Sequence, residues 1–587
     1  MKKITLLLVL VCSMSMFATR YLVQTGAPGA ATWRAAGAGE ELVDLTLKGQ
    51  NLNAWLGTIS IVAGDEIWLV TGTYNVNTMY SYTANFKIYG GFVGNETSLS
   101  ERIINNTAWN FVNESIIDGT ETTKIFYAGG ARVAIFDGLT IKNGKYTGNG
   151  AAIEARDGVL INACKFINNS STGNGGAVIL NGGGNISNSY FSGNLGNSGG
   201  AVHIGSGAGI TSSIINCYFE NNVASGYASN LGGALRSQFA GTLTVDNCIF
   251  KNNSATGNGS AIHIQLAAST NFTTVSNSLV FGNSGKGALY MVGGTLNNVT
   301  AVNNVDGGVY VGSATIPSKI YNSVFWGTGN SGAVTSTANN SVAIVQNTAY
   351  LSFQSANFTG VNNTNNILLD ANNTGSELGI NYPEFIDPTT NNWELGYKSA
   401  LLNTGQTIAA VTTDLSGVSR PQGASYDIGA YELPYFNTTV TFNTGGTVNA
   451  LTSGDILSEP KGKPLAFTIT PNSGQQIASV KYNDVEVKEE LVEGVYTAPA
   501  LAANATLVVE FSSTTSVNEI NSGLVCFANG NSIEIRGMKA GEEINVYSIT
   551  GATLFAQKAV SNTMNVPVAR GIYIVKAANQ VKKVVVD

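Results

Sequence analysis

The chain of 587 residues is poor in charge: Asp, Glu, Lys and Arg make up 11% of it, where soluble proteins average about 25%. Its 37 acidic and 30 basic residues leave a formal net charge of −7. Binding to duplex nucleic acid depends on Lys and Arg side chains that neutralise phosphates. We therefore expect no nucleic-acid partner for a chain with so few cations.

Proline is scarce too, with 11 residues, whereas glycine is abundant, with 69. Together they stay well below the share of about 25–30% that marks low-complexity disorder. The five cysteines are too few and too dispersed for a disulfide framework. The composition thus excludes disordered and collagen-like chains and indicates a folded, glycine-rich protein.

Long apolar runs are absent beyond the amino terminus. Two lysines precede the run from Ile4 to Val11, and small residues up to Ala18 offer a cleavage point, so residues 1–18 are predicted to be a secretory signal peptide. Cys12 raises the alternative of a lipid anchor, but Val11 stands where lipidation normally requires a small residue. No other stretch approaches the roughly 18 apolar residues of a membrane span, so we expect no transmembrane helix.

Two short motifs alternate in fixed order through the middle of the chain. The first is Phe, two residues, then Asn, and it begins at Phe166, Phe191, Phe219 and Phe250. The second is Gly-Gly-Ala or Gly-Ser-Ala, at residues 175–177, 199–201, 232–234 and 259–261. Successive copies lie roughly 21 to 31 residues apart, a period typical of solenoid repeats. The runs after the second motif alternate apolar and polar residues with the period of a β-strand.

Each copy is therefore predicted to form one coil of a parallel β-solenoid, in which equivalent positions stack about 4.8 Å apart. One column, expected at left-handed corners, contains Asn188, Asn216, Asn247, Asn277, Asn298 and Asn322. A second, expected inside the coil, contains Phe166, Phe191, Phe219, Phe250 and Phe325. We expect caps from residues 20–60 and from the segment after Tyr382, because solenoid ends are exposed sheet edges.

Three cysteines occupy one equivalent position, which is Ser in other copies; they are Cys164, Cys217 and Cys248. A small buried column explains the exchange between Cys and Ser, so these thiols are predicted to be buried and unpaired. A disulfide between Cys217 and Cys248 is the alternative. Metal binding by these cysteines is not expected.

One more column is the candidate binding site. Two residues past the Ala of each second motif stand Glu154, Ile179, His203, Arg236, His263, Tyr290 and Val311. The alternation of the strand sends this column outward, so four polar or aromatic residues from His203 to Tyr290 would span three inter-strand spacings, the length of a short oligosaccharide. Tyr can stack on sugar rings, and Arg and His can bond hydroxyls or carboxylates. The alternative is that these outward positions are polar without any ligand.

Catalytic clusters are missing from the repeats. A polysaccharide lyase would need several carboxylates for Ca²⁺ beside an Arg or Lys. Only six acids lie between residues 137 and 330, and they form no pair or column. No Gly-x-Ser-x-Gly motif precedes either histidine. We therefore predict no catalytic residue, metal ligand or cofactor, with calcium expected only if the protein is a lyase.

The paired repeat motifs resemble those of the polymorphic outer-membrane proteins, which implies a right-handed parallel β-helix displayed outside the cell. Segments 64–74 (GDEIWLVTGTY) and 88–92 (IYGGF), with the closing DIGAYE of 427–432, look like secreted β-helix proteins of the Bacteroidetes, often described as pectate-lyase-like or choice-of-anchor proteins. This resemblance covers residues 19–435, which we take as the β-helix domain.

The remainder of the chain is predicted to form two small β-sandwich domains, which completes an all-β fold class. Residues 436–513 are similar to Gly-Gly-Thr-Val repeats of bacterial surface proteins and are interpreted as a spacer. Residues 517–587, with VYSITG at 546–551 and VPVARGIYIVK at 566–576, resemble the C-terminal sorting domain of type IX secretion. The resemblance implies the type IX machinery as a partner. It also implies an extracellular or outer-membrane surface location in a Gram-negative bacterium.

Two functions follow as hypotheses. The first is a non-enzymatic secreted or cell-surface protein, an adhesin, glycan-binding or scaffold protein whose partner is a polysaccharide or cell-surface glycan. The second is an enzyme, a polysaccharide lyase or glycoside hydrolase of the pectate-lyase-like fold. The missing carboxylate clusters favour the first.

Overall fold

The computed structural model describes residues 18–25, 36–103, 109, 111–130, 132–205, 209–226, 230–239, 241–266, 268, 272–313, 315–327, 332–336, 341–353, 358, 362–370, 381–514, 523–577 and 579–587. The predicted signal peptide, Ala18 excepted, lies outside these residues. Among the described residues, no helix is both long and apolar enough to span a membrane.

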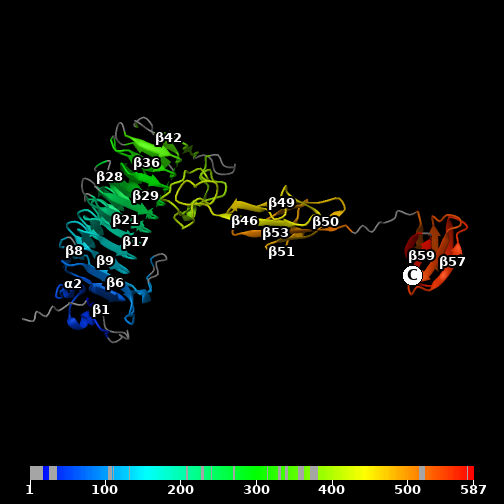
Figure 1. The fold of residues 1–587 in the computed structure, drawn as a ribbon, viewed down its shortest axis with the longest axis horizontal. Helices are drawn as coiled ribbons and strands as arrows, with labels where there is room; N and C mark the ends of the chain where they lie inside the picture. Colours follow the sequence, from blue (N-terminus) through cyan, green and yellow to red (C-terminus); the bar gives the residue numbers. More distant parts are fainter. Residues whose placement is uncertain are drawn as a thin grey trace, which may run out of the picture.

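The main domain is a parallel β-helix, in which each coil adds one strand to each of several long parallel sheets (Figure 1). The 14-stranded sheet runs in the spatial order β2 (Glu40–Asp44), β1 (Arg20–Gln24), β3 (Glu66–Val70), β6 (Phe86–Phe92), β9 (Ala134–Asp137), β13 (Val159–Asn162), β17 (Gly184–Ser187), β21 (Thr211–Ile215), β25 (Thr242–Asp246), β29 (Phe272–Ser276), β33 (Thr295–Asn297), β36 (Ser318–Tyr321), β39 (Ala343–Gln346) and β42 (Asn362–Thr364). The 12-stranded sheet runs through β4 (Gly72–Asn75), β7 (Ser115–Asp118), β10 (Leu139–Lys142), β14 (Lys165–Ile167), β18 (Tyr190–Ser192), β22 (Tyr218–Glu220), β26 (Ile249–Lys251), β30 (Leu279–Phe281), β34 (Thr300–Val302), β37 (Val324–Trp326), β40 (Ala349–Tyr350) and β43 (Ile367–Leu368).

Two more parallel sheets complete the coils. The 11-stranded sheet runs through β41 (Ser352–Phe353), β38 (Ala333–Ser336), β35 (Val309–Val311), β32 (Leu289–Val292), β28 (Ile262–Leu266), β24 (Leu235–Phe239), β20 (Val202–Ile204), β16 (Val178–Leu180), β12 (Ile153–Ala155), β8 (Phe126–Ala128) and β5 (Tyr80–Tyr82). A six-stranded sheet contains β11 (Lys145–Tyr146), β15 (Ser170–Ser171), β19 (Leu195–Gly196), β23 (Val223–Ala224), β27 (Ser254–Asn258) and β31 (Ser284–Lys286). The predicted parallel solenoid is confirmed.

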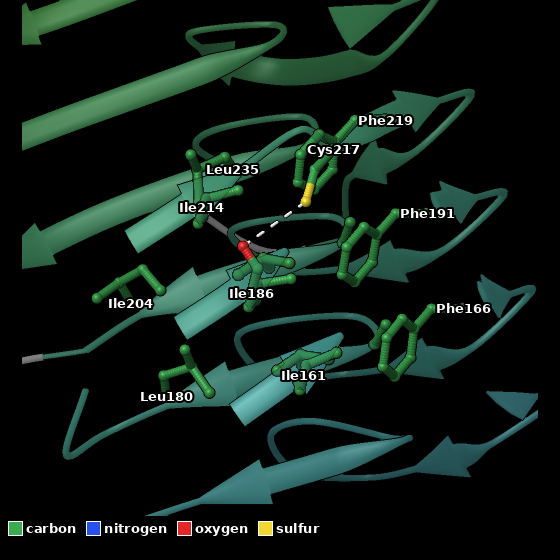
Figure 2. Packing of buried hydrophobic residues seen from close by; sticks show 14 of the residues in the cluster. Ile161, Phe166, Leu180, Ile186, Phe191, Ile204, Ile214, Cys217, Phe219 and Leu235 are labelled. Atoms are coloured by element: carbon green, nitrogen blue, oxygen red, sulfur yellow. Dashed lines mark hydrogen bonds between the residues drawn. The ribbon is translucent and has the colours of Figure 1, made fainter. Parts of the chain in front are cut away.

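Stacked side chains fill the interior of the coils. The rings of Phe166, Phe191, Phe219 and Phe250 lie 4.8 Å apart from one to the next and within 6° of parallel. Figure 2 shows three of these rings beside a row of buried isoleucines. Phe325 belongs to the same row, but a valine and an alanine stand between it and Phe250. The aromatic stack therefore ends where the repeat motif weakens.

Asparagine has two separate structural roles. The corner column from Asn188 to Asn322 has positive φ angles between 44° and 56°, as predicted. The Asn that ends each Phe-x-x-Asn motif, and its equivalent in the next two coils, instead points inward and is buried, in a ladder of Asn169, Asn194, Asn222, Asn253, Asn283 and Asn304. Within the ladder each Nδ2 donates to the next Oδ1 at 2.9–3.0 Å. These bonds join six successive coils.

The three cysteines of the repeat are buried and free, which confirms the prediction of unpaired thiols. Each thiol donates to backbone carbonyls, as Cys217 does to Ile215 at 3.3 Å and to Ile186 at 3.8 Å (Figure 2). Burial raises the pKa of Cys164 and of Cys248 far above the ordinary value for a thiol. The column therefore consists of protonated thiols packed in the solenoid core.

Two short helices cover the amino-terminal end of the solenoid. At the amino-terminal end, helix α1 (Leu45–Lys48) contributes Leu45 to the solenoid core, and helix α2 (Leu52–Leu56) contributes Leu52, Trp55 and Leu56. The short 3-10 turn η1 (Leu99–Glu101) follows β6.

Residues 381–434 were expected to cap the far end but instead pack along the outer face of the 12-stranded sheet. They contain the hairpin of β44 (Phe385–Asp387) and β45 (Asn392–Leu395), joined by η5 (Pro388–Thr390). The Asn298 amide donates to the carbonyl of Asp427 at 3.1 Å. The backbone N–H of Ala430 donates to Oγ1 of Thr300 at 2.8 Å. We call this segment the side segment.

Two small β-domains follow, each with two sheets around its own core. The first pairs β48 (Ile456–Pro460), β46 (Tyr435–Phe442), β53 (Ala505–Ser513), β50 (Gln475–Tyr482) and β51 (Val485–Glu486) with a second sheet of β47 (Gly446–Val448), β49 (Ala466–Pro471) and β52 (Val495–Thr497), and contains η6 (Lys488–Glu490). The second pairs β54 (Val525–Ala528), β55 (Ser532–Arg536) and β58 (Thr563–Pro567) with β57 (Thr553–Lys558), β56 (Glu543–Ser548), β59 (Gly571–Ala577) and β60 (Gln580–Val586).

Replacing one asparagine of the ladder should destabilise the solenoid. In Asn222→Ala, the carbonyl of Phe191 loses its bond to Nδ2, and the backbone N–H and amide of Asn194 lose their shared acceptor. Because each buried polar group without a partner costs about 1–3 kcal/mol, we expect a loss of about 3–5 kcal/mol. The free energy of solenoid unfolding in urea measures this loss.

Asn185→Ala is the matched control, because Asn185 is exposed on β17 and bonds only Ser213 among the described residues. It should change the unfolding free energy by less than about 0.5 kcal/mol. Equal effects of the two substitutions would contradict the role of the internal ladder.

Candidate functional site

The structure brings the predicted column together as one row of paired residues on the outer face of the 11-stranded sheet. Along this row, each residue is the register partner of the next: Glu154, Ile179, His203, Arg236, His263 and Tyr290. The row continues to Tyr310, and not to Val311 as predicted. Val311 points into the core and is fully buried, because β35 is shifted by one residue relative to the motif count. We call the part from His203 to Tyr310 the His-Arg row.

Three side chains of the His-Arg row are covered although they lie on the outer face. His203 and His263 are each 3% exposed and Arg236 is 8% exposed. The glycine turn that precedes each strand folds closely against the row. A Cβ atom on Gly232 would lie 3.1 Å from Cβ of Arg236, and one on Gly259 would lie 3.1 Å from Cα of His263. These glycines also have positive φ angles of 70° and 73°, so only glycine suits the turn.

Arg236 is the charged centre of the row. No ion pair joins it to any carboxylate that the structure describes, and its Nε is buried without a hydrogen-bond partner. The Nδ1 atoms of His203 and His263, on the strands to either side, are buried without partners as well. Burial lowers the pKa of Arg236 below its ordinary value. Three neighbouring strands therefore present unsatisfied polar atoms in a line.

Both histidines of the chain are neutral at ordinary pH. Burial, reinforced by the charge of Arg236, lowers the pKa of His203 to about 3 and that of His263 to about 3. A neutral imidazole has one donor and one acceptor nitrogen, so it can serve a hydroxyl group in either direction. The row thus combines one fixed cation with two neutral, amphoteric rings.

The far end of the row is aromatic and more open. The ring of Tyr290 stacks on His263 with centroids 4.9 Å apart and planes within 6°. Tyr290 and Tyr310 are both half-buried. Tyr310 was missed from the sequence because the weakened repeat hides the one-residue shift of its strand.

Glu154 lies apart from the other predicted site residues, in an ion cluster of its own. Ile179 separates it from His203 along the row. Its carboxylate is paired with the buried ammonium group of Lys124, and Arg156 Nη2 approaches it at 3.6 Å. Burial lowers the pKa of Lys124. With its charge already balanced, Glu154 has little left to offer a ligand.

The described residues contain no group of three or more His, Cys, Asp or Glu side chains that could hold a metal ion. The one charged residue of the His-Arg row, Arg236, has no acidic neighbour along the row. The His-Arg row itself thus contains no pair of carboxylates.

Sequence reasoning missed a groove at the corner between the 14-stranded and 12-stranded sheets. The groove has a volume of about 310 Å³ and is lined by Trp109, Asn188, Asn216, Cys217, Asn247, Ile249, Leu415, Ser416 and Tyr431. The asparagines were recognised only as corner residues. The aromatic rings come from distant parts of the chain, so no local motif signals them.

Comparison with known proteins gives two likenesses. The family model of the Chlamydia polymorphic membrane protein repeat matches residues 247–265, a span with one complete pair of repeat motifs. The crystal structure of pectate lyase Pel9A is similar with a TM-score of 0.41 and 13% identity, over 71% of this chain and 97% of that chain. A search of curated proteins finds no match.

The buried neutral histidines predict an acid-sensitive solenoid. Unfolded histidines titrate near pH 6.5, whereas His203 and His263 in the folded chain titrate at about 3. Between these values the unfolded chain binds more protons, so stability should fall as the pH is lowered, by up to about 1.4 kcal/mol per pH unit for each histidine. Urea unfolding between about pH 7.5 and about pH 5.5 measures this slope.

The double variant His203→Leu and His263→Leu provides the comparison for this measurement. Its unfolding free energy should depend less steeply on pH than that of the natural chain over the same window. An unchanged slope would show that the imidazoles titrate normally in the folded protein.

Proposed function

We propose that the protein is secreted or displayed at the cell surface and binds an acidic glycan without cleaving it. Arg236 carries this proposal, as a buried guanidinium that lacks a counter-ion and lies between two neutral histidines. A buried charge without a partner is strongly unfavourable. A carboxylate or sulfate group of a ligand would supply the missing counter-ion.

The chemistry of the His-Arg row suits a linear acidic sugar chain. A guanidinium can bind a carboxylate through two parallel hydrogen bonds, and such charge-assisted bonds are stronger in surroundings of low dielectric constant. Since neighbouring strands lie about 4.8 Å apart, His203 and His263 would flank the bound acidic group, where a sugar chain carries hydroxyls. At the open end, Tyr290 and Tyr310 offer rings on which a pyranose can stack.

Binding is favoured over cleavage because Arg236 is the only cation of the His-Arg row, and a lyase needs two groups with separate roles. A lyase would need one group to neutralise the uronate and another to abstract the proton. The lowered pKa of Arg236 would suit the second task, but then the carboxylate would lack a partner in the row. The lyase or hydrolase alternative therefore requires groups beyond the His-Arg row.

The terminal segments of the chain are proposed to direct its secretion. We propose that residues 1–18 direct secretion, that residues 436–513 act as a spacer, and that residues 517–587 are a type IX sorting domain of a Bacteroidetes-type bacterium. The repeat match at residues 247–265 and the parallel β-helix support an extracellular or outer-membrane surface location. The terminal β-domain with its own core supports a separable address signal.

Arg236→Met tests the binding proposal. The substitution keeps much of the side-chain volume and removes the unpaired charge, so the solenoid should be as stable as before or more stable. Affinity for polygalacturonate, alginate or a sulfated glycan should fall by at least about tenfold, as expected for loss of a buried charged hydrogen bond. Calorimetric titration and urea unfolding of the same samples measure both quantities.

Arg156→Met is the matched control, because Arg156 is a half-exposed arginine of the same solenoid outside the His-Arg row. It should leave affinity within about twofold. Equal binding by all three proteins would refute the proposed site. Formation of unsaturated uronates or new reducing ends from any of these polymers would replace the binding function with the enzymatic one.

A further inference from the structure

The corner groove is a second surface whose residues converge from three parts of the chain. The corner asparagines Asn188, Asn216 and Asn247 form its floor, and Trp109 forms part of a wall. The other wall, with Leu415 and Tyr431, belongs to the side segment, the loops that flank the solenoid before β46 in Figure 1. The groove is thus a product of the folded domain and is separate from the His-Arg row, which lies on another sheet.

Half-buried aromatic rings gather at this groove. The indole of Trp109 lies 5.6 Å from the ring of Tyr190 and 5.4 Å from that of Tyr218, and the two tyrosines lie 5.7 Å from each other. The indole Nε1 donates to the carbonyl of Asn188 at 3.1 Å, which fixes the orientation of the ring. Ordered, partly exposed aromatic faces of this kind are suited to the apolar faces of sugar rings.

The floor of the groove supplies amide groups at regular intervals. Asn247 Nδ2 donates to Asn216 Oδ1 at 2.7 Å, and Asn216 Nδ2 approaches Asn188 Oδ1 at 3.3 Å. The last acceptor of this chain, Asn247 Oδ1, is buried without a hydrogen-bond partner. A row of amides with one unsatisfied acceptor is suited to hydroxyl groups, which both donate and accept.

The groove lacks formal charge among the residues that line it. Nearby, Lys251 and Glu220 neutralise each other at 2.6 Å, and the hydroxyl of Tyr190 donates to Glu220 at 3.0 Å. Burial raises the pKa of Tyr431, so its phenol stays neutral. Nothing in the lining would attract an acidic ligand in preference to an uncharged one.

The wall from the side segment is firmly held. Arg420 pairs with Glu432 at 2.8 Å, and both side chains are fully buried. The backbone N–H of Leu415 donates to the carbonyl of Ala430 at 2.9 Å. These contacts keep Tyr431 in position without a ligand, so binding would cost little ordering of the wall.

We propose that the corner groove binds a neutral oligosaccharide, with sugar rings against Trp109 and Tyr431 and hydroxyl groups on the corner asparagines. Its volume of about 310 Å³ lies at the lower end of the range of about 300–1,000 Å³ for small-molecule sites. The inference does not depend on the acidic ligand proposed for the His-Arg row, since the two sites share no residue.

Titration of the purified protein with cellohexaose, laminarihexaose, mannohexaose and xylohexaose tests the proposal, by calorimetry and by tryptophan fluorescence. We expect at least one to bind with a Kd below about 1 mM. Trp109→Ala should weaken that binding by about tenfold, the equivalent of one aromatic contact. Asn216→Gly should weaken it severalfold, and it preserves the positive φ angle of 54° at this exposed corner.

Phe272→Ala is the control, because Phe272 is 58% exposed on β29, away from the groove. It should leave the affinity for the neutral hexasaccharide unchanged. The proposal is overturned if none of the four neutral hexasaccharides binds, or if both Trp109→Ala and Asn216→Gly bind as the natural chain does with unchanged thermal midpoints. Binding of hexagalacturonate that Arg236→Met abolishes would be assigned to the His-Arg row alone.

Discussion

The coils of the solenoid stay in register because buried asparagine amides bond each coil to the next. The ladder from Asn169 to Asn304 links six successive coils, and each Nδ2 group also bonds a backbone carbonyl, such as that of Phe191. A slip of one residue would break these bonds and turn every apolar side chain outward. The stacked phenylalanines, the buried thiols and the left-handed corners all require the same register. The two candidate sites depend on it too, since each includes a row of equivalent residues.

The same stacking explains the electrostatics of the outer face. Glycine turns that follow the fixed register approach the backbone of the 11-stranded sheet closely, and side chains that alternation alone would expose are buried there. Covered histidines remain neutral, and the covered Arg236 lacks a counter-ion. By contrast, Lys124 and Glu154 form a buried ion pair in which each charge has its counter-ion. The paired charges of Lys124 and Glu154 balance each other when buried. The charge of Arg236 is left for a ligand to balance.

The side segment covers part of the 12-stranded sheet, so the faces of the solenoid differ although its coils repeat. By packing along the 12-stranded sheet, it turns a corner made of asparagines into a groove with a second wall. One face of the domain therefore offers a cation among neutral rings, and another offers amides among aromatic rings. The two proposed sites therefore differ in chemistry although they belong to one solenoid.

The sequence by itself determined the solenoid, the register of its columns through the strong repeats, the left-handed asparagine corners and the burial of the cysteines. These features repeat in neighbouring coils, so each depends on side chains that recur within one period of the chain. Only the tertiary structure decided that His203, Arg236 and His263 are buried and that Glu154 pairs with Lys124. It also decided that Tyr310 takes the place expected for Val311. It alone brought Trp109 and Tyr431 to the same groove. These outcomes depend on contacts between a repeat and non-repeating segments, and no periodic pattern encodes such contacts.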